Sequence, residues 1–290
     1  MTIFDAIIQG ILQGLTEFLP VSSSGHLSLI QYFTGQNGET GALFSILLHL
    51  GTLLAVFIAF YKTVFSLIVE VFHILGDIFR GKFTLKTNDP YRRMIFMLFV
   101  SLLPLLVFVF LKDWYQAISS DNDITAEGIC FLITALLLYL ADRCPKGKKQ
   151  ADTMTAKDAL AMGIAQGIAP LPGVSRSGST VAAGMMMGLD REFAVTFSFI
   201  MGMPAVLGAN LLELPDIVGQ TVSIAPSVLI VGLLTSLIFG LLAIFMVRWL
   251  VKTDKFVYFS YYTFILGLLV TGIGIYEHFS GHALQQMFLG

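Results

Sequence analysis

One short sequence occurs twice in this chain, and the repeat restricts how the chain can fold. The first copy covers residues 10–26 and the second covers 163–179, so that equivalent positions lie 153 residues apart. The residues that recur at this spacing in the first copy include Gln13, Gly14, Ser22, Ser24 and Gly25. The same spacing aligns Asp5 with Asp158 outside the motif. The chain therefore consists of two related halves, each with one polar, glycine-rich loop.

The amino-acid composition places both loops in a membrane protein. Hydrophobic residues make up 56% of the 290 residues and charged residues only 12%. Apolar runs long enough to cross a bilayer recur along the whole chain, which predicts an all-α polytopic membrane protein. Residues 1–290 are expected to form one membrane domain, with repeats of about 1–150 and about 155–290. The net charge of −2, without a basic tract, excludes a nucleic-acid partner.

Six apolar segments have the length that a hydrocarbon core of roughly 30 Å requires. They cover about 43–60, 94–111, 127–141, 193–212, 226–247 and 256–276. Three connections are rich in Lys and Arg, and the positive-inside rule assigns them to the cytoplasm. They are 80–93, 143–157 and 248–255. The connections 112–127 and 213–225 are acidic and are expected to face out.

The motif copies lie in the middle of segments 3–34 and 157–190, and neither half of either segment is long enough to cross alone. Both segments are predicted to be re-entrant helix pairs that enter from opposite faces. Non-helical backbone at membrane depth is tolerated only where protein or a watery cavity surrounds it. The two loops should therefore meet near the midplane, and their meeting place is the predicted functional site.

The segment 63–79 decides whether the two halves are inverted. It is apolar enough to span, yet it carries Glu70, His73 and Asp77 on one helical face. If it spans, both repeats start on the same side. We favour a position in the cytoplasmic interface, with a solvated polar stripe rather than a metal-binding face. Each half then has a re-entrant pair and about three transmembrane helices, and the odd number gives two inverted-topology repeats.

The second loop combines hydroxyls, glycines and one arginine. Arg176 lies just ahead of a helix of small residues, where free N–H groups and a guanidinium fork form an anion site suited to phosphate. Ser175, Ser177 and Gly178 belong to the same loop. The alternative is an arginine that snorkels to the interface or pairs with Glu17 for structure alone. An arginine inside a membrane is costly enough that a functional role is the default.

The first loop repeats this design and adds titratable groups. Its hydroxyl and glycine positions are Ser22, Ser23, Ser24 and Gly25. Gln13 and Glu17 are four residues apart and share one helix face. A serine nucleophile, His26 or Glu17 as proton carrier and Arg176 as anion clamp are thus predicted to lie together. The spacing leaves open which serine acts, and helix capping without reaction is the alternative.

His49 lies within an apolar segment and aligns with Gly202 of the second half. A core histidine with one hydrogen-bond partner is expected there, rather than a catalytic group.

The two loops resemble the undecaprenyl-diphosphate phosphatase family, the bacitracin-resistance type of bacterial membrane phosphatase. Residues 13–26 fit the first motif of the family, residues 172–178 fit the second, and similarity in hydropathy covers essentially the whole chain. The resemblance implies hydrolysis of undecaprenyl diphosphate to the monophosphate and inorganic phosphate, which recycles the carrier lipid for peptidoglycan synthesis. It also implies a multi-pass protein of the bacterial inner membrane whose site opens toward the outer face.

The resemblance implies roles for individual residues as well. The active-site residues are Glu17, Ser23, His26 and Arg176, and phosphate binding is expected from Gln13, Ser22, Ser24, Gly25, Ser175, Ser177 and Gly178. A divalent cation, Mg²⁺ or Ca²⁺, is expected with Glu17 as its ligand. Many members have Glu where this chain has Gln13, so the cation should be held largely by diphosphate oxygens. Either Ser23 or His26 attacks the phosphorus.

A transporter or flippase for a polyprenyl phosphate or another anionic lipid is the alternative function, because inverted repeats with broken helices are typical of carriers. A carrier needs an anion site but no nucleophile, so phosphate release separates the two. A homo-oligomer is compatible with either function.

Overall fold

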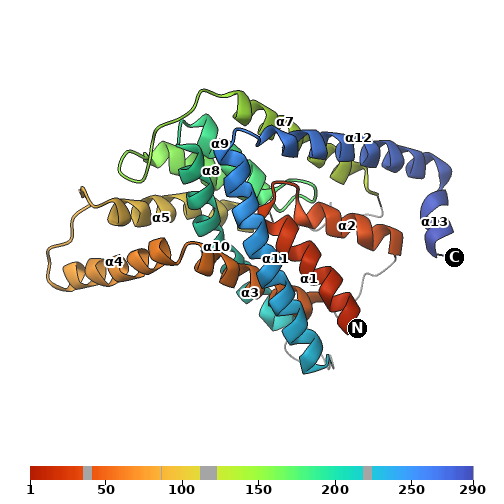
Figure 1. Cartoon of the computed structure of the whole chain (residues 1–290), viewed down its shortest axis with the longest axis horizontal. Coiled ribbons are helices and arrows are strands. Elements are labelled where there is room, and N and C mark those ends of the chain that lie inside the picture. The colour runs from red at the N-terminus through yellow and green to blue at the C-terminus, as the bar shows by residue number, and fades with distance from the viewer. Residues whose placement is uncertain (35–40, 86, 112–122, 218–223, 290) are drawn as a thin grey trace.

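The described part of the chain is built from helices joined by loops. The computed structural model describes residues 1–34, 41–85, 87–111, 123–217 and 224–289. In chain order the helices are α1 (Ile3–Phe18), α2 (Ser23–Thr34), α3 (Gly41–Ala59), α4 (Tyr61–Phe79), α5 (Pro90–Val109), α7 (Thr125–Arg143), α8 (Ala156–Ile168), α9 (Arg176–Met186), α10 (Arg191–Ile217), α11 (Pro226–Lys252), α12 (Val257–Ser280) and α13 (Ala283–Leu289). Within these ranges, extended pairing is limited to one isolated bridge between Lys149 and Leu189. The predicted all-α fold is confirmed (Figure 1).

Five helices are long and apolar enough to cross a membrane. They are α5, α7, α10, α11 and α12, and they coincide with five of the six predicted spans. Large apolar side chains point outward from them; on α5, for example, Phe99 is 66% exposed and Leu106 is 64% exposed. Contiguous apolar surface of this kind requires an apolar environment. The chain is a multi-pass membrane protein.

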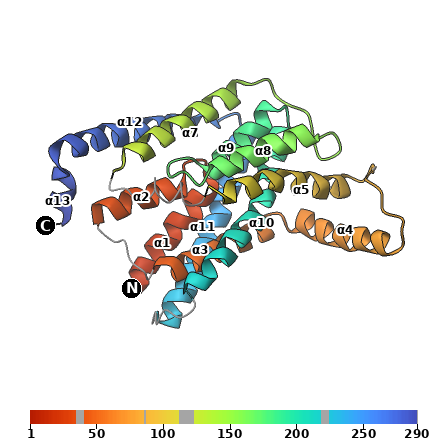
Figure 2. The same cartoon turned by 180° about the vertical axis from the view of Figure 1, so that it is seen from behind.

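The sixth predicted span, 43–60, is one arm of a bent helix pair. α3 and α4 meet at a bend of 90°, and α4 then lies alongside α5 (Figures 1 and 2). The 90° bend turns α4 away from the direction of α3, and the position of 63–79 in the cytoplasmic interface stays a prediction. Counted as one broken span, the pair still gives three spans before the second motif copy and three after it.

The polar stripe on α4 faces a cation on α5. Arg92 donates from Nε to Glu70 and from Nη2 to Asp77 at 2.8 Å, and His73 Nδ1 lies 3.0 Å from Glu70. The side chains of Glu70 and Arg92 are only 12% and 14% exposed. The expectation of a solvated stripe is therefore wrong for Glu70, which the ion pair with Arg92 ties to α5, whereas His73 is 64% exposed.

Two pairs of shorter helices carry the motif copies. α1 and α2 have 16 and 12 residues, and α8 and α9 have 13 and 11. At about 1.5 Å per residue, none of the four reaches across a core of roughly 30 Å. Each pair begins with a capping box, Thr2 with Asp5 and Thr155 with Asp158. The same helix start therefore occurs twice, 153 residues apart.

The loops inside these helix pairs touch each other. A side-chain carbon placed on Gly25 would lie 2.8 Å from Gly173, and one placed on Gly178 would lie 3.1 Å from Pro20. The two contacts are reciprocal, because Pro20 and Gly173 are equivalent positions of the repeat. Such close backbone approach requires glycine. The predicted meeting of the two motif loops is confirmed.

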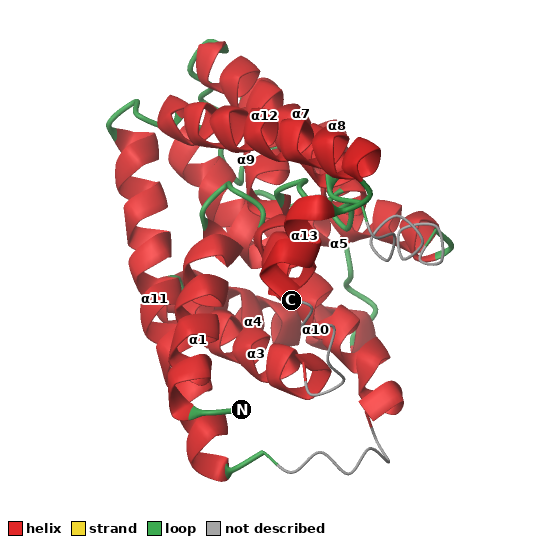
Figure 3. Ribbon diagram, turned by 90° about the vertical axis from the view of Figure 1, so that its right-hand side faces the viewer, coloured by secondary structure: helices red, strands yellow, loops and turns green. Residues whose placement is uncertain are grey.

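Helices of one half also pack against helices of the other half. α1 packs along α11, and its equivalent α8 packs along α5. α3 contacts its equivalent α10, and α7 lies beside α12 (Figure 3). The acidic connections at 112–122 and 218–223 lie outside the described residues. The inverted orientation of the halves and their boundary near residue 150 stay predictions.

Candidate functional site

The two halves meet at an ion pair between Glu17 and Arg176. Glu17 lies in the last turn of α1 with its side chain 7% exposed, and Arg176 is the first residue of α9 with its side chain 23% exposed. Nη2 of Arg176 donates to Oε1 of Glu17. A charge so far removed from water is stable only when a partner compensates it. The carboxylate of the first motif and the guanidinium of the second therefore lie together, as predicted.

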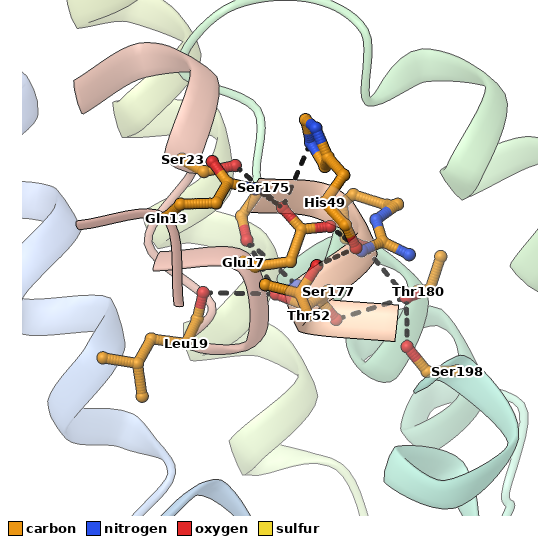
Figure 4. A network of polar contacts seen from close by, with 12 residues as sticks. Gln13, Glu17, Leu19, Ser23, His49, Thr52, Ser175, Ser177, Thr180 and Ser198 are labelled. Carbon is orange, nitrogen blue, oxygen red and sulfur yellow. Dashed lines mark hydrogen bonds and ion pairs between the residues drawn. The ribbon is translucent and has the colours of Figure 1, made fainter. Parts of the chain in front are cut away.

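Arg176 has room for its side chain because α10 presents a glycine to it. A side-chain carbon on Gly202 would coincide with Nη1 of Arg176, so the guanidinium lies directly against the backbone of α10. Thr180 braces the same turn of α9: its Oγ1 donates to the Arg176 carbonyl at 2.8 Å and lies 2.6 Å from Oγ of Ser198 on α10 (Figure 4). These contacts fix Arg176 beside Glu17.

Two side chains of the first motif donate to the other oxygen of Glu17. Nε2 of Gln13 donates to Oε2 at 3.0 Å, and Oγ of Ser23 donates to it at 3.4 Å (Figure 4). Gln13 precedes Glu17 by one helical turn, as the four-residue spacing predicts. Among the described hydrogen bonds, Ser23 is the one serine of the three that reaches the carboxylate. The structure thus distinguishes Ser23, which spacing alone could not do.

Ser22 and Ser24 build the turn that leads into α2. Ser22 has a φ of 69°, in the left-handed region that non-glycine residues rarely adopt. Its Oγ accepts the Gly25 N–H at 3.2 Å and lies 3.3 Å from Oγ of Ser24. These hydroxyls are therefore part of the loop structure, and the phosphate-binding roles of Ser22, Ser24 and Gly25 stay predictions.

The same pattern of hydroxyl hydrogen bonds precedes α9 in the second half, although Ser175 has a φ of −78° where Ser22 has 69°. Oγ of Ser175 accepts the Gly178 N–H at 3.1 Å and lies 3.3 Å from Oγ of Ser177, which donates to the Leu19 carbonyl at 3.2 Å (Figure 4). Both serines are buried, so their hydroxyls hold the two loops together. Phosphate binding by Ser175, Ser177 and Gly178 stays a prediction.

His26 is the predicted catalytic residue that the structure does not bring to the ion pair. Its Nδ1 lies 2.7 Å from the carbonyl oxygen of Ser22, and its Nε2 lies 2.7 Å from the hydroxyl of Tyr262 on α12. No described hydrogen bond or ion pair joins His26 to Glu17 or Arg176. The structure corrects the expectation that all of these groups form one cluster, because the first turn of α2 directs the imidazole toward α12.

His49 on α3 borders the ion pair instead. Its Nε2 lies 4.0 Å from Oε2 of Glu17, and its Nδ1 is 2.9 Å from the carbonyl of Ser45 (Figure 4). It has the single hydrogen bond that was expected of it, but sequence reasoning missed its place at the site. The available signal was its alignment with Gly202, since the two halves differ there as they differ at Glu17 and Arg176.

A small cavity of about 10 Å³, room for roughly one water molecule, opens beside the ion pair. Glu17, Arg176 and Gly202 line one part of it. Most of the remaining wall is apolar and comes from α1, α3 and α10; it includes Phe18, Leu53, Val56, Phe199, Met203 and Val206. Charged groups and apolar side chains therefore lie next to each other at this site.

The site contains no complete set of protein ligands for a metal ion. In the described ranges, no group of three or more His, Cys, Asp or Glu side chains could hold one. Glu17 supplies a single carboxylate, with Oε1 bonded to Arg176 and Oε2 bonded to Gln13. Mg²⁺ is often bound by one or two carboxylates together with substrate phosphates. These residues thus fit a cation only if the substrate supplies most of its ligands.

Comparison with known proteins identifies the family. Residues 6–269 match the family described as bacitracin resistance protein BacA. The undecaprenyl-diphosphatase of Treponema denticola is 39% identical over 276 residues, which cover 95% of this chain and 98% of that protein. Those of Alkaliphilus metalliredigens and Methanosphaera stadtmanae are each 38% identical over 93% of this chain and cover 98% and 97% of the relatives. The matched range contains Glu17, Ser23 and Arg176, and the chain belongs to the bacitracin resistance protein BacA family.

Proposed function

We propose that this chain hydrolyses undecaprenyl diphosphate to undecaprenyl phosphate and inorganic phosphate, and so recycles the carrier lipid for cell-wall synthesis. Relatives named undecaprenyl-diphosphatase match it over 93% to 95% of its length. The observation that carries the proposal is the pairing of Glu17 with Arg176 beside a largely apolar cavity. A lipid diphosphate combines an anionic head, which suits Arg176, with an apolar chain, which suits the apolar side chains around the pair.

Arg176 is proposed to leave Glu17 for the terminal phosphate of the substrate. Its guanidinium fork suits bidentate binding of phosphate oxygens. The N–H groups of Arg176 and Ser177 at the start of α9, which take part in none of the described hydrogen bonds, add donors for the same anion. Donors that are already oriented stabilise charge as it develops in the transition state. Glu17 is then free to accept a proton or to contact a cation.

Ser23 is the proposed nucleophile. Its Oγ attacks the terminal phosphorus, and its proton passes to Glu17, to which it is already hydrogen-bonded. The bond between this phosphorus and the bridging oxygen breaks, and undecaprenyl phosphate leaves. Water then attacks the phosphoserine, the bond between phosphorus and Oγ of Ser23 breaks, and inorganic phosphate leaves. Glu17 returns its proton to Oγ, and His26 is proposed to carry the proton that the water loses. Direct attack by His26 is the alternative that the sequence left open.

The remaining expectations concern the cation and the membrane. Glu17 would hold a divalent cation, Mg²⁺ or Ca²⁺, together with the substrate, and the cation would supply positive charge to the diphosphate. The bacterial inner membrane is the proposed location, with the site open to the outer face. The Lys and Arg residues of the connections 80–93, 143–157 and 248–255 support a cytoplasmic position for these connections.

Phosphate release by the purified chain in detergent tests the proposed function. Undecaprenyl diphosphate is supplied with and without a chelator, and Arg176→Ala serves as the inactive control. We expect release by the parent chain, and loss of release both in the variant and with chelator. A folded parent chain that releases no phosphate would exclude hydrolysis and favour the flippase. Release that persists with chelator would reject the proposed cation requirement but not the hydrolysis.

A further inference from the structure

The hydrogen bonds of His26 determine which of its nitrogens accepts a proton. Nδ1 lies 2.7 Å from the carbonyl oxygen of Ser22. A carbonyl oxygen can only accept, so Nδ1 carries the hydrogen and Nε2 is the acceptor of the neutral ring. Ser22 supplies this carbonyl from a left-handed backbone conformation. Such strain persists where the surrounding structure requires it and is common at functional sites.

The accepting nitrogen of His26 is occupied by a tyrosine from the other half of the chain. Oη of Tyr262 lies 2.7 Å from Nε2, and because Nε2 accepts, the phenol donates. The two rings are parallel within 4°, with centroids 5.9 Å apart. Phe131 on α7 meets the imidazole edge to face at 5.4 Å. A carbonyl, a hydroxyl and two aromatic rings thus define the position of the imidazole.

The Tyr262 hydroxyl has no other described role. The side chain is 47% exposed, and among the described hydrogen bonds its hydroxyl takes part only in the one to His26. Its neighbour Tyr261 is almost equally exposed, at 48%, and its ring contacts Tyr258 on the same helix. Any contribution of Tyr262 to helix packing therefore comes from its ring, and its hydroxyl contacts His26.

We infer that Tyr262 is a positioning residue for His26, whose hydroxyl fixes the direction of the ring and keeps Nε2 as its accepting nitrogen. The inference rests on the proposed function, in which His26 carries a proton during hydrolysis. Any proton that the neutral ring accepts must bind at Nε2, the atom that Tyr262 contacts. Without the Tyr262 hydroxyl, the imidazole would be free to rotate or to change tautomer, and its accepting nitrogen would no longer have a fixed place beside the first motif. The chemistry of the first motif therefore depends on α12 of the second half.

Removal of the single hydroxyl tests this inference. Tyr262→Phe keeps the ring, and Tyr261→Phe makes the same change at the adjacent residue as a matched control. With undecaprenyl diphosphate, we expect kcat of Tyr262→Phe to fall roughly ten- to a hundredfold while KM stays within about threefold, since small misplacements act mainly on the chemical step. Tyr261→Phe should behave like the parent chain. In a His26→Gln background, Tyr262→Phe should cause no further loss.

A second measurement does not depend on turnover. The ¹⁵N NMR signals of histidine report whether Nε2 is a hydrogen-bonded acceptor, and loss of a signal in His26→Gln assigns it to His26. We expect the Nε2 signal to move toward that of a free acceptor in Tyr262→Phe and to stay in place in Tyr261→Phe. A parent-like kcat, an equal loss in both backgrounds or an unchanged Nε2 signal would each overturn the inference. A parent chain without phosphate release would reject the proposed function instead.

Discussion

The substitution Gly202→Ala tests the arrangement of the ion pair most directly, because it adds one carbon at a known place. The added carbon would coincide with Nη1 of Arg176, and α10 is a helix whose backbone cannot easily shift. The guanidinium must therefore move away from α10 and from Glu17. Gly208→Ala on the same helix is the matched control, since nothing lies within 4 Å of a carbon added there.

The expected magnitude follows from the burial of the pair. Glu17 is 7% exposed and Arg176 is 23% exposed, and breaking a buried ion pair costs about 3–5 kcal/mol. Replacing glycine by alanine within a helix contributes about 1 kcal/mol of stability in return. The free energy of unfolding should thus fall by about 2–4 kcal/mol in Gly202→Ala and rise slightly in Gly208→Ala. Turnover should fall by about 10² to 10³ in Gly202→Ala, the loss expected when an oriented donor is misplaced.

Two measurements check this prediction: denaturant unfolding in detergent and phosphate release from undecaprenyl diphosphate. A double-mutant cycle isolates the cause, because Gly202→Ala should no longer destabilise a chain that already carries Arg176→Ala. If Gly202→Ala is as stable and active as Gly208→Ala, Arg176 does not lie against α10, and the proposed position of the guanidinium is wrong.

Three further predictions concern the anion clamp, the nucleophile and the topology. Arg176→Lys keeps the charge but loses the fork, so turnover should fall by about 10² to 10³; near-normal turnover in a folded variant would remove Arg176 from the site. Ser23→Ala should abolish phosphate release, while Ser22→Ala and Ser24→Ala retain some. If Ser23→Ala keeps about a tenth of the parent rate or more and His26→Ala is inactive, the imidazole is the nucleophile, because the loss of one hydrogen bond to phosphate explains a tenfold drop. Single cysteines at Thr2 and Leu85 should label from opposite sides of the membrane, and labelling from one side would reject the inverted repeat.

The parts of the fold that the sequence predicted depend on composition and spacing. Five spans follow from apolar length alone. The four-residue separation of Gln13 and Glu17 places both on one face of α1, and their hydrogen bond confirms it. The meeting of the loops follows from two glycine-rich segments that neither span the membrane nor tolerate exposure to lipid. These predictions need no knowledge of how distant helices pack.

The predictions that failed depend on how distant helices pack. His26 was expected beside Glu17, but α2 docks against α7 and α12 with Phe131 only 2.6 Å from the position of a carbon added to Gly25, and this turns the imidazole toward Tyr262. The stripe on α4 was expected in solvent, but α5 folds back along it and brings Arg92 into contact. The spacing of residues along a helix predicts neither the orientation of the His26 ring nor the partner of the polar face of α4, because each depends on a residue of another helix.

The asymmetry of the site is encoded by two pairs of equivalent positions. Arg176 and Gly202 of the second half correspond to Ser23 and His49 of the first, 153 residues earlier. In the second half, the long side chain of Arg176 needs the missing side chain of Gly202. In the first half, a small residue at position 23 is combined with a large one at position 49, and both face Oε2 of Glu17. A histidine at 202 would exclude the guanidinium, and an arginine at 23 would add a second cation beside one carboxylate. The differences at 23/176 and at 49/202 therefore depend on each other. Together they place one carboxylate, that of Glu17, between the guanidinium of Arg176 at Oε1 and the groups of Ser23 and His49 near Oε2.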